Sequence, residues 1–253
     1  MISIRCFIPE PCKKLLRKMR QGLYAVAYVR APSESAHFCP VCEKGLVRFR
    51  KLSYGDTKCF ICGSDERHRL VWLFLHRLTN LFDGSSRTML HVAPEIQFEN
   101  GLRAAVGPSY ITADLLDPRA KVKMDITNIQ YPDSFFDVIY CSHVLEHIPN
   151  DRLAMREFVR VLKPSGWAVI MVPCYPDRGK TFEDPSVTDP KERLRLFGQE
   201  DHVRIYGNDF IDRLNAAGFD VRVIRSSDFL SPAEIARFNL TTHSGDVFLC
   251  TKR

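Results

Sequence analysis

The feature that most constrains the fold is a regular alternation, from residue 88 onward, of short apolar runs with helical stretches. Each apolar run has the length of a buried strand, and strands that alternate with helices are typical of βαβ units around a mainly parallel sheet. The expected strands cover residues 88–93, 109–113, 137–141, 167–172, 219–225 and 246–251. The last two are separated by no long crossover other than residues 231–239, which fits an antiparallel pair at one edge. We therefore expect an α/β domain.

A polar cluster follows the expected strand 137–141. It comprises Cys141, Ser142, His143, Glu146 and His147. In open α/β sheets, ligands bind beyond the carboxyl ends of the strands. The sequence therefore predicts a functional site at this end of the strand.

The stretch that contains this cluster, FDVIYCSHVLEHIP over residues 136–149, closely resembles a known motif. It is similar to the fourth-strand motif of class I S-adenosylmethionine (SAM)-dependent methyltransferases of the type 11 branch, roughly F-D-x-[VI]-x-[CS]-x-x-V-L-E-H. The resemblance implies a Rossmann-like methyltransferase domain with SAM as its cofactor. It assigns Asp114 to the ribose hydroxyls and the pair Asp125-Ile126 to the adenine, although each aspartate alone is also a common turn residue. By position, the resemblance extends the cofactor site to His91, Ala93, Glu95, Leu115, Cys141 and Ser142.

The first cofactor motif departs from the family pattern. Where the family shows [DE]-x-G-x-G-x-G, residues 91–97 read HVAPEIQ. Without the glycines, this backbone is expected to lack the torsions that only glycine adopts, whereas Pro94 fixes its own φ. The chain resembles a branch of type 11-like proteins that carries H-x-A-P-E here, often behind a cysteine-rich front. Because the other cofactor motifs occur in the expected order, we expect SAM binding to be retained.

Four of the nine cysteines occur in the spacing C-x₂-C-x₁₆-C-x₂-C. They are Cys39, Cys42, Cys59 and Cys62. Two C-x₂-C pairs joined by a segment of hairpin length are typical of a closed structural Zn²⁺ site with four thiolate ligands. The plainer alternative is four free core thiols. The odd cysteine count and this pairing favour a reducing compartment and metal binding over disulfides.

The front of the chain is basic. Residues 1–87 carry 16 Lys and Arg against 7 Asp and Glu, a net of +9, whereas residues 88–253 carry 20 against 23, a net of −3. Residues 12–28 are expected to form a basic amphipathic helix. This asymmetry indicates an anionic partner, either RNA or an anionic membrane surface touched by residues 12–28, and a solvated basic face is the alternative. We find no membrane-spanning run and no secretion signal, so we expect a cytoplasmic protein.

The acceptor side of the site requires a group that removes a proton, and histidine suits that role near pH 7. His143 and His202 are the predicted catalytic bases. The long polar segment 174–207 is expected to be a lid-like insertion that contacts the acceptor, with a solvated surface insertion as the alternative. The predicted acceptor-binding residues are His147, Asp201, Arg204 and Tyr206.

These expectations favour a SAM-dependent methyltransferase that acts on a small-molecule or saccharide acceptor, by resemblance in polysaccharide or glycoconjugate assembly. A first alternative is an RNA base methyltransferase whose zinc domain binds RNA, although no N-P-P-[YF]-type motif follows residues 137–141. A second alternative is a non-catalytic zinc-ribbon binding protein with a degenerate methyltransferase fold. The expected parts are a basic helical segment (1–38), a zinc-ribbon-like unit (39–66), a linking helix (67–87) and the methyltransferase domain (88–253).

Overall fold

The computed structural model describes residues 28–31, 35–53, 55–175 and 177–253, and these form two units. Unit 1 contains the described residues up to Leu73 together with Leu230–Ser244, and unit 2 contains Phe74–Phe229 and Gly245–Arg253. The predicted amphipathic helix of residues 12–28 lies outside the described residues, apart from Tyr28. Among the described residues, no helix combines the length and the apolar content needed to cross a membrane.

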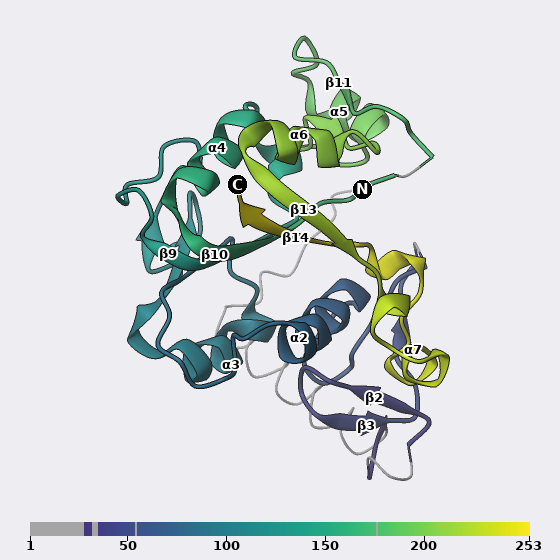
Figure 1. Ribbon diagram of the computed structural model, residues 1–253. Helices are drawn as coiled ribbons and strands as arrows, with labels where there is room; N and C mark the ends of the chain where they lie inside the picture. Colours follow the sequence, from purple (N-terminus) through teal and green to yellow (C-terminus); the bar gives the residue numbers. More distant parts are fainter. Residues whose placement is uncertain (1–27, 32–34, 54, 176) are drawn as a thin grey trace. The chain divides into compact units, whose positions relative to one another are not determined.

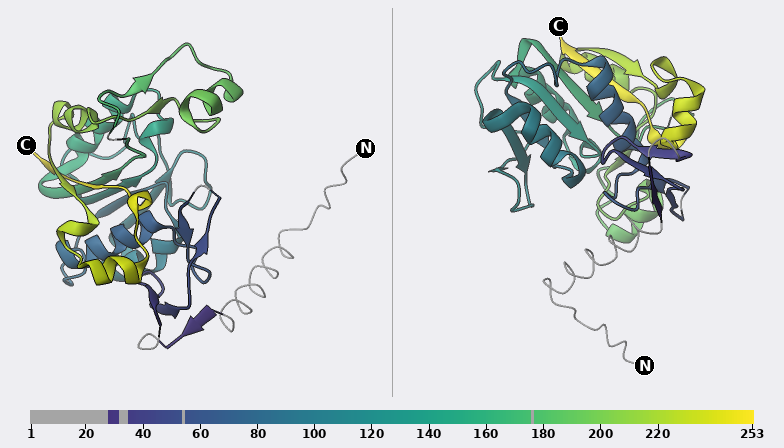
Figure 2. Two further views of the ribbon diagram at one scale, coloured as in Figure 1. Left: turned by 90° about the vertical axis from the view of Figure 1, so that its right-hand side faces the viewer. Right: turned by 90° about the horizontal axis from the view of Figure 1, so that it is seen from below.

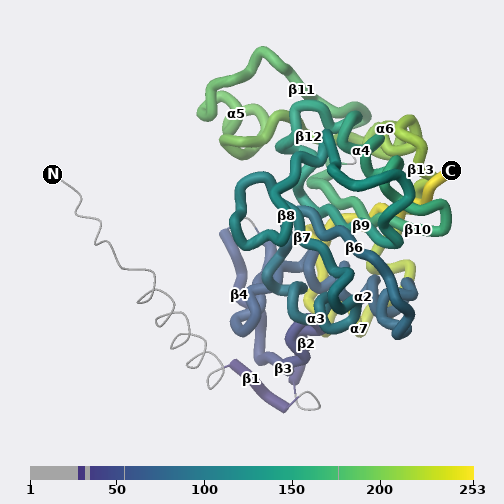
Figure 3. Tube along the Cα trace, turned by 90° about the vertical axis from the view of Figure 1, so that its left-hand side faces the viewer, coloured from purple at the N-terminus to yellow at the C-terminus, as the bar shows by residue number. Residues whose placement is uncertain are grey.

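Unit 2 is built around a seven-stranded sheet with the order β13-β14-β10-β9-β6-β7-β8. Figure 3 labels β6, β7, β8, β9, β10 and β13 along the Cα trace. The strands are β6 (Met89–Val92), β7 (Tyr110–Asp114), β8 (Val122–Lys123), β9 (Phe136–Ser142), β10 (Leu162–Met171), β13 (Phe219–Ile224) and β14 (Val247–Lys252). Strands β6 to β10 pair in parallel, whereas β14 runs antiparallel to both β10 and β13. The expected Rossmann-like α/β fold, its six strands and its antiparallel edge pair are confirmed.

Helices cover both faces of this sheet (Figure 1). α3 (Ile96–Val106) lies on one face, and α4 (Asp151–Val161) and α6 (Phe210–Ala217) lie on the other. The central strands are therefore buried on both sides, which explains why β6 is apolar at nearly every position rather than alternating. The side chain of Asn150 accepts a hydrogen bond from the Leu153 amide at 3.1 Å and so caps the N-terminus of α4.

The insertion between β10 and α6 has its own secondary structure. Strands β11 (Phe182–Glu183) and β12 (Arg204–Ile205) pair in antiparallel fashion, and α5 (Pro190–Phe197) lies between them in sequence. Figure 1 shows α5 and β11 near α6, beyond the body of the sheet. A short 3-10 turn, η2 (Leu145–His147), follows β9 and contacts β12. Three further 3-10 turns are η1 (Gly107–Ser109), η3 (Ser226–Asp228) and η4 (Thr242–Ser244).

The described part of unit 1 contains short strands and helical segments. β1 (Val29–Arg30), β3 (Lys44–Leu46) and β2 (His37–Cys39) form an antiparallel sheet, and β4 (Arg50–Lys51) pairs with β5 (Thr57–Lys58). The predicted linking helix is α2 (Glu66–Leu78), whose first part belongs to this unit. α7 (Pro232–Phe238) packs beside β2, as both views of Figure 2 show in yellow and purple.

Arg69 joins the two chain segments of unit 1. Its fully buried guanidinium donates to the carbonyl oxygens of Phe238 at 2.8 Å and Asn239 at 3.0 Å, and also to Thr57 O at 3.1 Å. Buried charged groups need such partners, because an unpaired one is costly. This residue therefore fixes Leu230–Ser244 to the front of the chain. The domain bounds expected from the sequence assign these residues to the methyltransferase domain (88–253) and do not include this return of the chain to unit 1.

Candidate functional site

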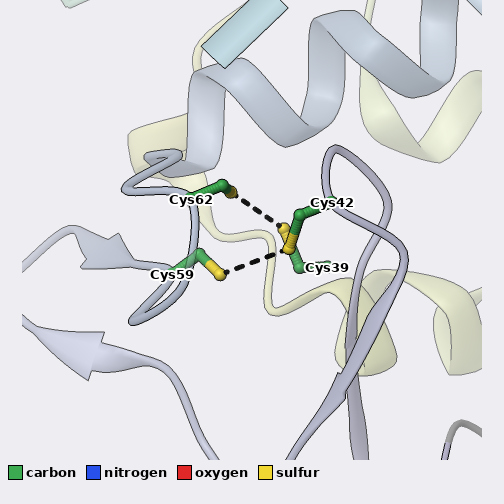
Figure 4. A group of neighbouring side chains, drawn as sticks. All are labelled: Cys39, Cys42, Cys59 and Cys62. Atoms are coloured by element: carbon green, nitrogen blue, oxygen red, sulfur yellow. Dashed lines mark hydrogen bonds between the residues drawn. The ribbon is translucent and has the colours of Figure 1, made fainter. Parts of the chain in front are cut away.

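Four cysteine side chains converge within unit 1 (Figure 4). Cys39 and Cys42 lie where β2 turns into β3, and Cys59 and Cys62 lie between β5 and α2. The Sγ atoms of Cys39 and Cys62 are 3.7 Å apart, and those of Cys42 and Cys59 are 3.8 Å apart. A tetrahedral ion with bonds of about 2.3 Å to sulfur separates its ligands by about 3.8 Å. These two distances match that separation, and all four sulfur atoms lie within 4.8 Å of one another, as a closed metal site requires.

Both C-x₂-C loops turn sharply at the residue after their second cysteine. Glu43 and Gly63 occupy these positions and have φ values of 56° and 76°. Glycine adopts this left-handed region freely, whereas glutamate does so uncommonly. The second turn therefore has a sequence signal, and the first could be found only from the structure.

Polar groups with hydrogen-bonding protons lie next to the sulfur atoms. Ser64 Oγ lies 3.3 Å from Cys39 Sγ and 3.2 Å from Cys62 Sγ, and the Ile61 amide donates to Cys59 Sγ at 3.4 Å. Such donors stabilise negative charge on thiolates, and ligand sets for metal ions commonly have them. The surroundings of the cluster therefore match its geometry.

In unit 2, residues from three neighbouring parallel strands stand level at the carboxyl edge of the sheet. Val92 on β6 pairs with Ala113 on β7 and with Cys141 on β9, so the residues that follow these three are level as well. They are Ala93, Asp114 and Ser142. From β6, the chain continues to β7 and β8 on one side and then returns to β9 on the other side. The strand order therefore reverses at β6, and open α/β sheets bind ligands at such a topological switch point.

The turn after β6 is sharp although it contains no glycine. Ala93 has a φ of 48°, and its amide donates to Ala113 O at 2.8 Å. The left-handed helical region is open to alanine at a cost of roughly 1–2 kcal/mol. Because its glycines are missing, this turn is expected from the sequence to lack left-handed torsions. That expectation is wrong at Ala93, which adopts a positive φ.

His91 and Glu95 support this turn from inside. The buried His91 ring places Nδ1 2.7 Å from the Tyr110 hydroxyl, and its Nε2 accepts from the Glu95 amide at 3.3 Å. The Glu95 carboxylate accepts from the Tyr140 hydroxyl at 2.8 Å. Their hydrogen bonds hold the end of β6 against its neighbours, so His91 contributes to the edge by positioning its turn.

Asp114 ends β7 and organises the loop that follows. Its Oδ1 accepts from the amides of Leu116 at 2.7 Å and Asp117 at 2.8 Å. Leu115 is 49% exposed beside it. The carboxylate therefore serves as a turn cap while it also stands at the switch point.

The segment after β8 lies next to the end of β7, because the Met124 amide donates to Asp114 O at 3.0 Å. Asp125 is exposed, and its Oδ1 accepts from the amide and the hydroxyl of Thr127 at 2.8 and 2.7 Å. Ile126 is buried. The structure thus brings the predicted ribose and adenine residues to adjoining parts of one edge.

The end of β9 contributes Cys141 and Ser142. Burial raises the pKa of the Cys141 thiol well above its ordinary value, so this side chain is a neutral packing group. Ser142 Oγ is buried and has no hydrogen-bond partner within the described part of the chain. A buried hydroxyl without a partner costs about 1–3 kcal/mol, so this atom indicates a place for a polar group of a ligand.

Beyond Ser142, ionisable side chains cluster on the acceptor side. His143 has a φ of 55° and places Nδ1 3.6 Å from Oε1 of the buried Glu146. Glu146 and His202 line a small pocket with Tyr175 and Phe197. Burial and the neighbouring His147 lower the pKa of His202, which keeps its imidazole neutral at neutral pH.

His147 and Asp201 also belong to this cluster. His147 Nδ1 lies 3.2 Å from a carboxylate oxygen of Asp201, and its ring meets the ring of His202 edge to face with centroids 4.6 Å apart. Asp201 itself is 71% exposed. The structure therefore brings together five predicted residues of the acceptor side or its neighbourhood: His143, Glu146, His147, Asp201 and His202.

Arg204 and Tyr206 have a different setting. The buried Arg204 guanidinium donates to the carbonyl oxygens of Leu145, Ile148 and Pro149, and the Tyr206 hydroxyl donates to Asp151 Oδ2 at 2.8 Å. Arg204 also borders the pocket, but its donors are taken by protein oxygens. Both side chains tie the insertion to η2 and α4, which supports a positioning role in place of the predicted contact with an acceptor.

Sequence reasoning missed two members of this network, Arg213 and Glu183. Arg213 donates to Asp151 Oδ2 at 3.0 Å and to Glu183 Oε1 at 2.7 Å. The burial of Arg213 could in part be predicted from the sequence, because Arg213 lies three residues after Phe210 and beside Leu214 and so shares the apolar face of α6. Glu183 lies in a polar stretch of the sequence without apolar periodicity, so nothing there predicts its contact with Arg213.

Comparisons with known proteins find similarity to methyltransferases in the part of the chain that forms this edge of the sheet. The family model described as a methyltransferase domain matches residues 89–170. The uncharacterized methyltransferase YcgJ of Bacillus subtilis is 26% identical over 134 residues, which cover 51% of this chain and 51% of that protein, so the chain spans about half the length of this relative.

Among solved structures, an S-adenosylmethionine dependent methyltransferase from Mesorhizobium loti has 15% identity and a TM-score of 0.48, with 73% of this chain and 98% of that chain covered. The structure of YcgJ has 16% identity and a TM-score of 0.46, with 74% and 99% covered. The family match runs from β6 into β10 and so contains Ala93, Asp114 and Ser142. The matched domain supports a methyltransferase.

Proposed function

We propose that this chain is a SAM-dependent methyltransferase whose acceptor is a small molecule or a saccharide. The observation that carries the proposal is the level placement of Ala93, Asp114 and Ser142 at the switch point, within the residues that match a methyltransferase domain. A polar edge of this kind suits a nucleoside-containing ligand, because its carboxylate can accept bonds from ribose hydroxyls.

The residues at this edge fit the parts of SAM. Asp114 would accept hydrogen bonds from the ribose, and Leu115 with Ile126 and Asp125 would flank the adenine. The turn at Ala93 and the free hydroxyl of Ser142 would meet the methionine portion. When bound, SAM supplies a methyl group on a sulfonium, so the protein's task is mainly to position the acceptor.

On the acceptor side, His143 is the proposed base. It follows Ser142 directly, and its Nδ1 lies beside the Glu146 carboxylate at 3.6 Å, a contact that orients the ring. As the methyl group moves to an acceptor oxygen or nitrogen, His143 would take the proton that this atom loses. His202, which is neutral and lines the pocket, would form part of the wall against which the acceptor lies.

Calorimetry with SAM and with its demethylated product tests the cofactor proposal. We expect both to bind with a stoichiometry of one, and ATP, which shares the adenosine but lacks the methionine, to bind far more weakly. If none of them binds to folded protein, the non-catalytic alternative replaces this proposal. A methyl-transfer screen over saccharides, small metabolites and RNA would then identify the acceptor.

We also propose that the four cysteines hold a structural Zn²⁺. Four soft thiolates without a free coordination position favour this ion and a stabilising role. The Co²⁺-substituted protein should show the charge-transfer absorption of a metal thiolate, and Cys59→Ser should weaken it and destabilise unit 1. Cys174→Ser is the matched control, because this thiol donates to Gly207 O outside the cluster and serine keeps that bond. An absent thiolate band in the parent protein would refute the zinc site.

A further inference from the structure

A second group of metal-ligating side chains lies on the acceptor side of unit 2. Glu146 and His147 come from η2, and His202 comes from the loop before β12. One ligand atom of each residue lies within 4.8 Å of the others. The two chain segments are held together by the hydrogen bond from the Val203 amide to Glu146 O at 2.9 Å, so their proximity is built into the fold.

The orientation of His202 suits a ligand. Its Nδ1 lies 3.1 Å from the carbonyl oxygen of Phe197, which can accept only a donated proton, so the lone pair of the ring belongs to Nε2. This Nε2 is buried and has no hydrogen-bond partner within the described residues, and the side chain is 6% exposed and lines the pocket. Metal-bound histidines commonly donate their other N–H to a carbonyl in this way.

His147 shows the related arrangement with a carboxylate. Its Nδ1 lies 3.2 Å from Asp201, which fixes the ring and leaves Nε2 as the nitrogen for an ion. A histidine whose second nitrogen faces a carboxylate is a common pattern around bound metals. Asp201 is thus a positioning residue for His147.

Glu146 supplies the third group. Its side chain is 2% exposed, and buried carboxylates are paired or coordinate metals. The neighbouring His143 lies 3.6 Å from its Oε1, and ligand atoms of the two histidines of the group lie within 4.8 Å of a carboxylate oxygen. The carboxylate therefore joins the proposed base to this cluster.

We propose that Glu146, His147 and His202 bind a divalent transition-metal ion through one carboxylate oxygen and two imidazole nitrogens. Two imidazoles and a carboxylate suit first-row ions that accept nitrogen and oxygen, in contrast to the soft four-cysteine set. Bonds of about 2.0–2.2 Å place ligand atoms roughly 3–3.5 Å apart, so atoms that lie within 4.8 Å of one another need to close by at most about 1–2 Å, which the partly exposed His147 permits.

Three protein ligands leave coordination positions open for water or for a hydroxyl of the acceptor. The ion would lower the pKa of the water or hydroxyl that it binds. This consequence rests on the proposed methyl transfer. The binding test therefore contains neither SAM nor an acceptor, so that failure of the metal site and failure of the methyltransferase proposal are separate results.

The experiment uses the full chain with the four-cysteine site first filled with Zn²⁺, followed by titration with Co²⁺. We expect one further ion per chain, with weak ligand-field absorption and no thiolate charge-transfer band. His147→Ala and Glu146→Gln should each weaken Co²⁺ binding by about tenfold or more, and Asp201→Asn by roughly 10–100-fold through the loss of orientation.

His76→Ala is the matched control, since His76 is an exposed histidine on α2 outside the group. Circular dichroism of each variant checks that it remains folded. The proposal is overturned if the parent chain takes up no further Co²⁺, if a thiolate band shows that Co²⁺ only displaced Zn²⁺, or if the variants bind as the parent does. Equal loss in His76→Ala would show a non-specific surface effect and would overturn it as well.

Discussion

At the scale of single residues, Asp114 caps its loop and is proposed to bind the ribose, and a pair of substitutions separates these two roles. Asp114→Ala removes both the charge and the loop cap, whereas Asp114→Asn keeps a carbonyl oxygen for the amides of Leu116 and Asp117. Because hydrogen bonds to a charged group contribute about 1.5–3 kcal/mol, we expect Asp114→Asn to weaken SAM binding by roughly tenfold or more. Calorimetry measures the affinity, and thermal melting should be nearly unchanged.

The matched control is Asp117→Asn. Asp117 lies in the same loop, and its carboxylate pairs with Arg119 on the surface. We expect SAM affinity to stay within about twofold, since exposed ion pairs contribute little. Equal losses in the Asp114 and Asp117 variants would mean that loop structure or general charge, and not a bond to the ribose, determines the affinity.

His143 offers a second residue-scale test, because its backbone limits which substitutions are informative. With a φ of 55°, the position tolerates asparagine well, so His143→Asn removes the base without opposing the backbone. A general base contributes typically about 10²–10⁴-fold to a rate, and we expect kcat to fall within that range while SAM affinity is retained. Single-turnover methyl transfer to the identified acceptor measures the rate. An unaltered kcat would assign His143 to packing.

At the scale of elements, the buried charges between the insertion and α4 predict a large stability effect. Asp151, itself buried, accepts from Tyr206 at 2.8 Å and from Arg213 at 3.0 Å. Asp151→Ala removes the carboxylate that accepts from the Tyr206 hydroxyl and one of the carboxylates that pair with Arg213, Glu183 being another. Breaking a buried pair of this kind costs up to about 3–5 kcal/mol. We therefore expect Asp151→Ala to lower the free energy of unfolding by about this amount in urea denaturation.

Asp133→Ala serves as the comparison for this element. Asp133 pairs with Arg160 at 2.9 Å, but its side chain is 76% exposed, so its removal should cost only about 0–1 kcal/mol. Similar losses in the two variants would show that the insertion is not held by this network. A large loss confined to Asp151→Ala supports Arg204, Tyr206 and Arg213 as residues that position the insertion.

Comparison of elements with the sequence shows what periodicity can predict. Strands such as β6 and β9 were evident because both faces are buried, which produces continuous apolar runs. The strands β8, β11 and β12 have two residues each and leave no such pattern. Their positions depend on contacts with distant segments.

The residues of the candidate site also fall into those that the sequence predicts and those that only the structure shows. Asp114 and the cysteine pairs were recognisable because a strand end or a fixed spacing marks them. The left-handed torsion of Ala93 and the approach of His202 to Glu146 have no local signal, since they arise from how the turn and the insertion pack. The burial of Arg204 and Tyr206 was missed for the same reason, because a polar insertion does not show which of its side chains turn inward.

At the scale of the whole molecule, each unit is assembled from separated stretches of chain. Arg69 bonds to Asn239 across 170 positions, and Glu66 accepts from the Thr241 amide across 175. Unit 1 therefore cannot complete its hydrogen bonds until nearly the entire chain is present. Contacts of such sequence separation are also slow to form during folding, because loop closure must precede them.

The distribution of charge over the chain leads to the last prediction. Residues 1–87 have a net charge of +9, which attracts any polyanion, so binding to RNA alone does not identify RNA as the acceptor. For a small-molecule or saccharide enzyme, we expect only non-specific binding of rRNA hairpins, at ~10⁻⁴–10⁻⁶ M near physiological salt and falling steeply as salt rises. Arg50→Ala and Lys51→Ala, on the exposed β4, should lower the salt slope by about one each if they touch phosphates, whereas Lys191→Ala on α5 is the control. Fluorescence anisotropy over a salt series measures these values. Structure-selective binding below ~10⁻⁶ M, outside the non-specific range, would instead contradict this expectation and favour RNA as the substrate class, with the basic front as its docking surface.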